Sequence, residues 1–232
     1  MRDGGGVVRE DGDVGEVYAD HAATTPPAPE VRAAMAPWLA GLHGNASSVH
    51  HLGERARDAV ETARAQVASL VHALPEEVVF TASGSEANNL ALKGTLALMP
   101  PDRRRIVISA IEHPSVLETA RALQATGAGL DIVPVDAGGI VDPDDLARRL
   151  GPDVAIVSVM AVNNEIGTLQ PIADIARAAR AAGARMHCDA VQAAGRLPLD
   201  FAALGLDLMT LAAHKLGGPL GAAALVVRRR TR

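Results

Sequence analysis

The stretch Val78-Val79-Phe80-Thr81-Ala82-Ser83-Gly84-Ser85-Glu86 passes from a β-branched, apolar run through small residues into a helix pattern. Runs of both kinds then alternate along the chain. Several apolar runs are nearly continuous, as is typical of parallel strands covered on both faces. The alternation predicts an α/β fold with a mainly parallel sheet and helices on both faces. Strands are predicted at 78–81, 106–109, 130–135, 154–160, 185–189, 207–211 and 222–227, and helices at 29–39, 54–70, 85–98, 115–126, 143–150 and 172–182.

The composition limits the classes of protein to consider. The 232 residues carry a net charge of −5, which argues against a nucleic-acid backbone as a partner. No apolar run approaches the ~20 residues that a membrane-spanning helix needs, so no membrane partner is expected. Residues 1–16 are rich in Gly, Asp and Glu, and they are predicted to form a flexible tail rather than a secretory signal.

Cysteine and lysine are both scarce. The single cysteine, Cys188, excludes a disulfide framework and a multi-cysteine metal site, and no other spacing of residues predicts a metal site. We therefore expect a cytoplasmic protein. Of the 22 basic residues, only Lys93 and Lys215 are lysines. Because arginine does not deprotonate at working pH, chemistry that needs a neutral amine must use one of these two.

Two of the predicted strand ends offer groups for an anion and for a planar ligand. Gly84 and Ser85 begin a helix, where free backbone N–H groups and the helix dipole suit a phosphate; the alternative is that Ser85 only caps the helix. His113 follows the strand at 106–109, and its ring can stack on a cofactor or move a proton; the alternative is a solvated loop histidine. Ser115 and Glu118 have the spacing of a capping box.

Polar side chains also follow two later apolar runs. Asn163 and Asn164 can donate to an oxyanion, or they can stabilise a turn. Asp189 ends a buried run, where a carboxylate needs a partner such as a protonated ring nitrogen; the alternative is a cap of a helix or turn. Since side chains alternate along a strand, Cys188 should face away from Asp189.

Lys215 follows the apolar run at 207–211 and precedes the turn Gly217-Gly218-Pro219. A lysine among Leu and Ala residues is unusual, and burial favours the neutral amine that forms Schiff bases with aldehydes. Lys93 lies late in a helix pattern, where an exposed lysine is the ordinary interpretation. A phosphate site, a stacking ring, an amide, a carboxylate and a lysine, all at strand ends, are the groups that pyridoxal phosphate requires.

In seven ordered stretches the sequence resembles the cysteine desulfurases, which are pyridoxal-phosphate enzymes of the class V aminotransferase group with the type I fold. The resemblance runs from about Val17 to the C-terminus. It therefore implies that residues 17–232 form the cofactor-binding large domain of that family. The matching stretches are 18–26, 44–50, 80–89, 112–113, 162–167, 187–192 and 214–221.

The resemblance implies a role for each matching site residue. Lys215 would form the Schiff base with the cofactor and move the Cα proton, and His113 would stack on the ring. Asp189 would hold the pyridine nitrogen, while Gln192 and Asn164 would bond the phenolic oxygen of the ring.

The resemblance also implies that Gly84, Ser85 and His214 bind the phosphate. Ala212 stands where the family usually has a phosphate-binding serine, so one charge-assisted hydrogen bond, worth roughly 1.5–3 kcal/mol, is missing. The implied reaction takes sulfur from L-cysteine, leaves alanine, and passes a persulfide to an acceptor protein for iron–sulfur or thiocofactor assembly. A homodimer is expected because the family's members are homodimers.

The family pattern continues beyond residue 232. The nucleophilic cysteine, the arginine for the substrate carboxylate and most of the small domain lie in that part, so this chain is expected to be C-terminally truncated and not to complete desulfuration alone. Three functions stay open: a cysteine desulfurase; another enzyme of the group, such as an aminotransferase or selenocysteine lyase; and a chain that binds the cofactor without turnover. The motifs at 45–48 and 163–165 favour the first.

Overall fold

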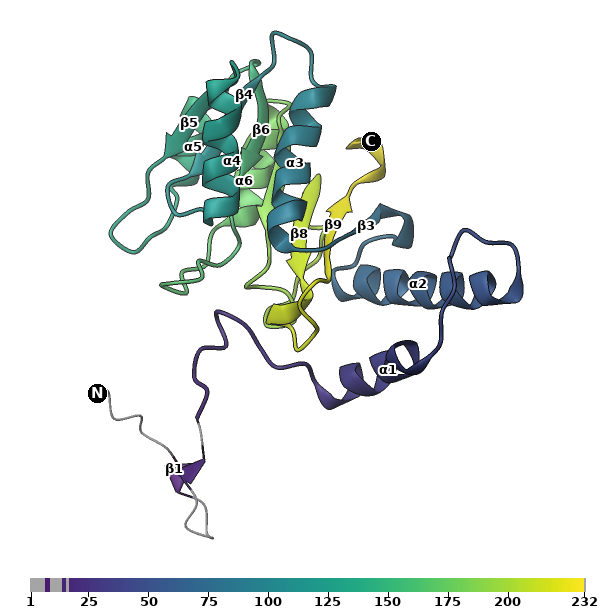
Figure 1. Ribbon diagram of the computed structural model, residues 1–232. Coiled ribbons are helices and arrows are strands. Elements are labelled where there is room, and N and C mark those ends of the chain that lie inside the picture. The colour runs from purple at the N-terminus through teal and green to yellow at the C-terminus, as the bar shows by residue number, and fades with distance from the viewer. Residues whose placement is uncertain (1–6, 9–13, 16, 232) are drawn as a thin grey trace.

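A seven-stranded sheet forms the centre of the computed structural model, which describes residues 7–8, 14–15 and 17–231 (Figure 1). Its strand order is β3-β9-β8-β7-β6-β4-β5. The five neighbouring strands β8, β7, β6, β4 and β5 run parallel to one another, whereas β9 is antiparallel to both β3 and β8. The prediction of a mainly parallel sheet is therefore confirmed. The strands are β3 Val78–Thr81, β4 Arg105–Ser109, β5 Gly129–Val133, β6 Val154–Ser158, β7 Arg185–Asp189, β8 Leu208–Ala212 and β9 Ala223–Val227.

Helices cover both faces of this sheet, as predicted. Ile106 and Ile108 of β4 pack in one core cluster with residues of α3 and α4, while Val107 between them packs in a second cluster with residues of α5 and α6. This division follows from the alternation of side chains along a strand. The helices are α1 Pro29–Ala40, α2 His51–Leu70, α3 Gly84–Leu98, α4 Pro114–Ala125, α5 Pro143–Arg149 and α6 Ile172–Ala181, and the 3-10 turns are η1 Pro75–Glu77, η2 Ala213–Lys215 and η3 Arg229–Thr231.

Every predicted helix and strand is present, and the ends differ by three residues at most. One local prediction is wrong, because Ser115 and Glu118 do not form a capping box. The helix α4 begins at Pro114, whose fixed φ suits the first helical position, and His113 is its cap residue. Glu118 instead pairs with Arg121 on the surface.

The helix α1 lies away from the sheet (Figure 1). No residue of α1 is buried. The flexible tail predicted at 1–16 lies outside the described residues, except for β1 Val7–Val8 and β2 Val14–Gly15, which pair with each other antiparallel. Within the part of the chain that the structure describes, no helix is long and apolar enough to cross a membrane.

The direction of β9 decides which loops meet. Because β9 runs opposite to both β3 and β8, β3 points the same way as the parallel strands. The loops that follow β3, β4, β6, β7 and β8 therefore share one edge of the sheet, and this is the edge where open α/β sheets bind ligands.

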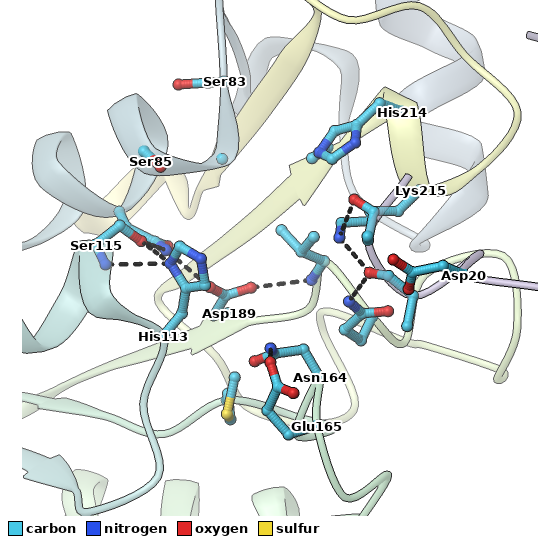
Figure 2. Close-up of a pocket in the computed structure, with 18 residues that line it drawn as sticks. Asp20, Ser83, Ser85, His113, Ser115, Asn164, Glu165, Asp189, His214 and Lys215 are labelled. Carbon is cyan, nitrogen blue, oxygen red and sulfur yellow. Dashed lines mark hydrogen bonds between the residues drawn. The ribbon is translucent and has the colours of Figure 1, made fainter. Parts of the chain in front are cut away.

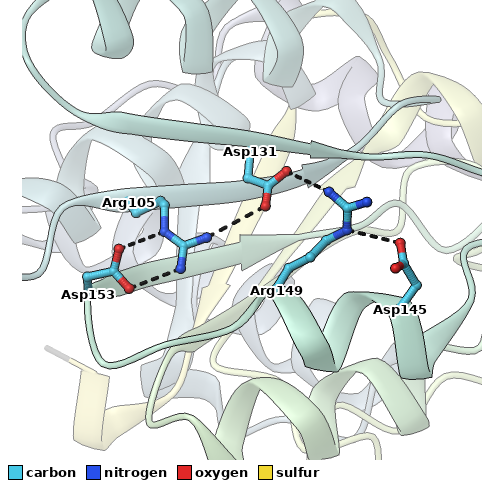
Figure 3. A network of polar contacts seen from close by, with 5 residues as sticks. All are labelled: Arg105, Asp131, Asp145, Arg149 and Asp153. Carbon is cyan, nitrogen blue, oxygen red and sulfur yellow. Dashed lines mark hydrogen bonds and ion pairs between the residues drawn. The ribbon is translucent and has the colours of Figure 1, made fainter.

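An ionic network ties together β4, β5, α5 and the turn before β6 (Figure 3). Arg105 donates to both carboxylate oxygens of Asp153, at 2.7 and 3.0 Å, and lies 3.6 Å from Asp131. Arg149 joins Asp131 to Asp145, at 3.1 and 2.9 Å. These side chains are partly exposed, so solvent screens the pairs and each contributes little to stability.

A buried carboxyl group links the ends of β4 and β6. Oε1 of Glu112 accepts hydrogen bonds from the Ser109 hydroxyl and, at 2.8 Å, from the Met160 N–H. Oε2 is buried without a partner among the described residues. Burial is the main cause that raises the pKa of Glu112 to about 8, and the nearby charge of Asp189 raises it further. Glu112 is therefore protonated at neutral pH.

The substitution Glu112→Gln tests this assignment. The pKa of Glu112 rises from 4.5 to about 8 on folding, so the folded protein holds the extra proton between these values. The free energy of unfolding should therefore fall as pH rises through this window, by up to ~1.4 kcal/mol per pH unit from this group. Glutamine does not ionise, so the variant should lose this slope.

Urea unfolding at several pH values, without cofactor, measures the effect. The matched control is Glu118→Gln, which makes the same change at an exposed site of α4 and should keep the slope of the parent. Equal slopes for the parent and Glu112→Gln would show that Glu112 ionises normally.

Candidate functional site

One cavity of about 440 Å³ lies at the edge of the sheet where these strands end (Figure 2). Its volume is within the ~300–1,000 Å³ typical of small-molecule sites. Of the two lysines, Lys215 lines the cavity and Lys93 is exposed on α3. The structure brings together at this cavity all nine residues that the sequence singled out, while the role of each stays a prediction: Gly84, Ser85, His113, Asn164, Asp189, Gln192, Ala212, His214 and Lys215.

The N-terminus of α3 opens into the cavity. Its cap is Ser83, whose Oγ accepts from the N–H of Glu86 at 3.1 Å, while the Glu86 carboxylate accepts from the N–H of Ala82 at 2.7 Å. The alternative that Ser85 caps the helix is therefore wrong. Among the described residues, no acceptor binds the N–H groups of Gly84 and Ser85. These two groups remain able to bind an anion.

Small side chains bring this helix close to the sheet. A Cβ added at Gly84 would lie 3.2 Å from Cγ2 of Val191 and 3.6 Å from Cβ of Ala212. The first distance is tighter than ordinary van der Waals contact, so a larger residue at 84 would displace the wall. Glycine thus leaves the backbone N–H groups accessible beside the end of β8.

Asp189 places a carboxylate in the floor of the cavity, where 5% of the residue is exposed. Oδ2 accepts from Nδ2 of Asn88 at 2.7 Å, and Oδ1 accepts from the N–H of Val191 at 3.0 Å. Asp189 therefore does cap a turn, as its alternative interpretation proposed, while it also lines the cavity. Burial is the main cause that raises the pKa of Asp189, against the effect of these two bonds. Such a carboxylate gains from a cationic neighbour.

Cys188 faces away from this carboxylate, as the strand alternation predicts. Its side chain is buried in the core cluster that contains α6, and burial raises the pKa of the Cys188 thiol well above its usual value. The thiol is therefore neither at the cavity nor ionised.

A chain of hydrogen bonds connects His113 to Asp189 (Figure 2). Nδ1 of His113 accepts from the N–H of Ser115 at 3.1 Å and lies 2.7 Å from its hydroxyl. The same hydroxyl accepts from Asn88 at 2.9 Å, and Asn88 donates to Asp189. Because Nδ1 is an acceptor here, the neutral ring carries its proton on Nε2. His113 is thus an exposed cap residue whose ring is oriented by these bonds, so it is solvated as its alternative interpretation proposed while it also lines the cavity.

Lys215 lies in η2, directly after β8. Its ammonium donates to the carbonyl oxygens of Ala22 and, at 2.7 Å, of Ala23. Burial is the main cause that lowers the pKa of Lys215, and the charge of Arg196 lowers it further, while Asp20 and other carboxylates raise it. The amine is therefore more readily neutral than that of an exposed lysine.

The two adjacent asparagines have different surroundings. Oδ1 of Asn163 accepts from the N–H groups of Glu165 and Ile166, at 2.9 and 3.1 Å, so Asn163 stabilises a turn. Asn164 lines the cavity, and its amide donates to the Glu165 carboxylate at 2.6 Å. Only Asn164 of this pair can meet a ligand there.

Gln192 and His214 both contact the segment that precedes α1. Nε2 of Gln192 donates to the carbonyl oxygen of Ala22 at 2.8 Å. Nδ1 of His214 lies 3.2 Å from the hydroxyl of Thr24. Burial and the charge of Lys215 lower the pKa of His214, so its ring is neutral at neutral pH.

Sequence reasoning assigned no role to some residues of the cavity wall. Ala22 and Ala23 accept hydrogen bonds from Lys215 through their backbone carbonyl oxygens. Every residue has such an oxygen, so the sequence gives no signal for this contact. Asn88 gave a weak signal, since it is a polar residue about one turn after Ser85 on the buried side of α3. Asp20 lies in a stretch that was singled out only through the family resemblance.

The family model for class V aminotransferases matches residues 17–232. Cysteine desulfurase IscS of Dictyoglomus turgidum is 42% identical over 217 residues, which cover 94% of this chain and 55% of the relative. A cysteine desulfurase of Frankia sp. is 45% identical over 218 residues, which cover 90% of this chain and 52% of the relative.

A solved structure of SspA in complex with cysteine superposes with a TM-score of 0.89 at 35% identity, covering 91% of this chain and 61% of that one. The chain spans about half the length of the curated relatives it matches. Since the family model covers almost the whole chain, the protein belongs to the class V aminotransferase family, whose cysteine desulfurases depend on pyridoxal phosphate.

Proposed function

We propose that these 232 residues form the cofactor-binding part of a pyridoxal-phosphate-dependent cysteine desulfurase. The observation that carries this proposal is that Lys215, Asp189 and the open N-terminus of α3 line one cavity. An amine, a carboxylate and an anion site match the aldehyde, the pyridine nitrogen and the phosphate of a single ligand.

The described residues fit this cofactor. Among the described residues no cation hydrogen-bonds to the buried Asp189 carboxylate, although the charges of His113 and Lys215 act on it from farther away. A protonated pyridine nitrogen would supply a cation in direct contact. Gly84 and Ser85 present N–H groups for the phosphate, and His214, Asn164 and Gln192 are assigned to the same ligand. When bound, the cofactor withdraws electrons from the Cα of an amino acid.

The chain's own residues then bind, orient and move protons. Lys215 would hold the aldehyde carbon of the cofactor, and its amine would accept the Cα proton of the substrate. Its lowered pKa favours this step. His113 lies on the cavity wall with its Nε2–H available, so it is assigned to the ring and to proton transfer.

The thiolate that takes the sulfur must come from outside these 232 residues. The only cysteine of the sequence, Cys188, is buried on the opposite side of β7. A cofactor-binding chain without turnover of its own is therefore the second candidate for what these residues do alone. The named relatives support cysteine desulfuration over aminotransfer or selenocysteine lysis, and the bound cysteine of SspA supports L-cysteine as substrate.

The partners and the compartment complete the proposal. No residue of α1 is buried, and Leu39 at its end is 81% exposed. Val49, between α1 and α2, is 91% exposed. These side chains offer apolar surface to a second copy of the chain in a homodimer. The sulfur would pass to an acceptor protein for iron–sulfur or thiocofactor assembly. A single buried thiol suits the reducing cytoplasm.

The substitution Lys215→Ala tests the cofactor site. The parent chain, incubated with pyridoxal phosphate and gel-filtered, should keep the visible absorbance of the lysine-bound cofactor. Lys215→Ala should lose that band because no other amine lines the cavity within the described residues. The matched control is Lys93→Ala, which should keep it. A band that survives Lys215→Ala, or that disappears in Lys93→Ala, would refute the assignment.

The substitution Ala212→Ser tests the phosphate end. Ala212 lies beside Gly84, so a serine hydroxyl there should reach the bound phosphate. One charge-assisted hydrogen bond is worth roughly 1.5–3 kcal/mol, so the dissociation constant of pyridoxal phosphate should fall about 10- to 100-fold. Titrations with pyridoxal, which lacks the phosphate, serve as the control and should not change. Equal changes for both ligands would place the phosphate elsewhere.

The 232-residue chain should bind the cofactor without completing desulfuration, because it has no accessible thiol. Sulfide and alanine are measured after addition of pyridoxal phosphate and L-cysteine, and the full-length Dictyoglomus turgidum relative serves as the positive control. Sustained release of alanine by the chain alone would contradict the proposal.

A further inference from the structure

Arg196 stands beside the cavity, and its guanidinium contacts three separate segments of the chain. Nη1 donates to Oε1 of Gln192 at 2.6 Å and to the carbonyl oxygen of the same residue at 3.5 Å. Nη2 donates to the carbonyl oxygens of His21 and Lys215, at 3.2 and 3.4 Å. One side chain thus connects the turn after β7, the segment before α1 and the end of η2.

These contacts decide how the Gln192 amide is oriented. A guanidinium has only donors, so the group that faces it must be the amide oxygen. Nε2 of Gln192 is then directed the other way, where it donates to the carbonyl oxygen of Ala22 at 2.8 Å. The same carbonyl accepts from the Lys215 ammonium, so a continuous set of contacts runs from Arg196 through Gln192 and Ala22 to Lys215.

The same contacts argue against a role for Arg196 as an anchor for a substrate carboxylate. Of the five N–H groups of a guanidinium, the four on Nη1 and Nη2 are matched by four carbonyl or amide acceptors. Gly195 makes this arrangement possible, because its φ of +71° turns the chain, and a Cβ there would lie 2.9 Å from Cδ2 of Leu216.

We propose that Arg196 is a positioning residue: it fixes Gln192 as a hydrogen-bond donor toward the cavity and holds the 21–22 segment against Lys215. This inference rests on the proposed function, since the acceptor that Gln192 serves is the phenolic oxygen of pyridoxal phosphate. Removing Arg196 leaves the bond from Nε2 to the Ala22 carbonyl as the one described contact that favours this orientation, and a rotated amide would present its oxygen to the phenolic oxygen.

A double-mutant cycle between Arg196→Met and Gln192→Met tests the coupling. The first readout is the dissociation constant of pyridoxal phosphate, followed by its Lys215-dependent visible band. Arg196→Met should weaken binding about tenfold in the parent, as expected for one lost charge-assisted bond, and less than about twofold in the Gln192→Met background. Arg196→Lys keeps a cation opposite Oε1 and should recover part of the loss.

A second readout needs no cofactor. Arg196→Met should lower the thermal unfolding midpoint by about 2–4 °C in the parent and by clearly less in the Gln192→Met background. The matched control is Arg103→Met, which removes a half-buried arginine that binds the carbonyl oxygens of Val154 and Ala182 far from the cavity. This control should lower stability and leave cofactor binding and the band unchanged.

Two outcomes overturn the inference, and a third refutes the proposed function on which it rests. Equal effects of Arg196→Met in both backgrounds would show that Arg196 does not act through Gln192. An unchanged dissociation constant in Arg196→Met would show that the site does not need it. A parent chain without a Lys215-dependent band would refute the proposed function, while the unfolding cycle would still report separately on the contact between Arg196 and Gln192.

Discussion

The burial of one negative charge governs the candidate site. Asp189 ends β7 with 5% of the residue exposed, and its donors among the described residues are the Asn88 amide and the Val191 N–H. Burial outweighs both bonds and the nearby charges of His113 and Lys215, since the pKa of Asp189 is raised. The carboxylate is therefore costly to ionise in the free protein, and a cation that enters the cavity would lower the free-energy cost of burying it.

A second carboxyl group, that of Glu112, is buried close to this site. Glu112 stays protonated because burial, together with the charge of Asp189, raises its pKa to about 8. Its bonds to Ser109 and Met160 hold the ends of β4 and β6 together without adding a second negative charge. The charge of Asp189 at the candidate site thus affects the pKa of Glu112, which joins β4 to β6.

The candidate cofactor-binding groups and the thiol that desulfuration needs do not lie at the same place in this chain. The groups that suit the cofactor lie within these 232 residues, at the ends of parallel strands that a buried core holds rigidly. A thiol for the sulfur step does not lie at the cavity, because Cys188 points into the opposite core cluster. The candidate cofactor residues thus meet within a chain that spans about half the length of the curated relatives it matches.

The sequence by itself determined the alternation of strands and helices and the nine residues that meet at the cavity. The alternation follows from periodicity, and parallel strands bring their carboxyl ends to one edge with the residues that end them. Gln192, Ala212 and His214 were identified only through the family resemblance. Only the tertiary structure decided that Ser83 and His113 are the cap residues, that β9 runs antiparallel, and that Lys215 is held by Ala22 and Ala23. The last contact joins residues more than 190 positions apart through backbone carbonyls, which every residue type carries and which therefore leave no trace in a sequence.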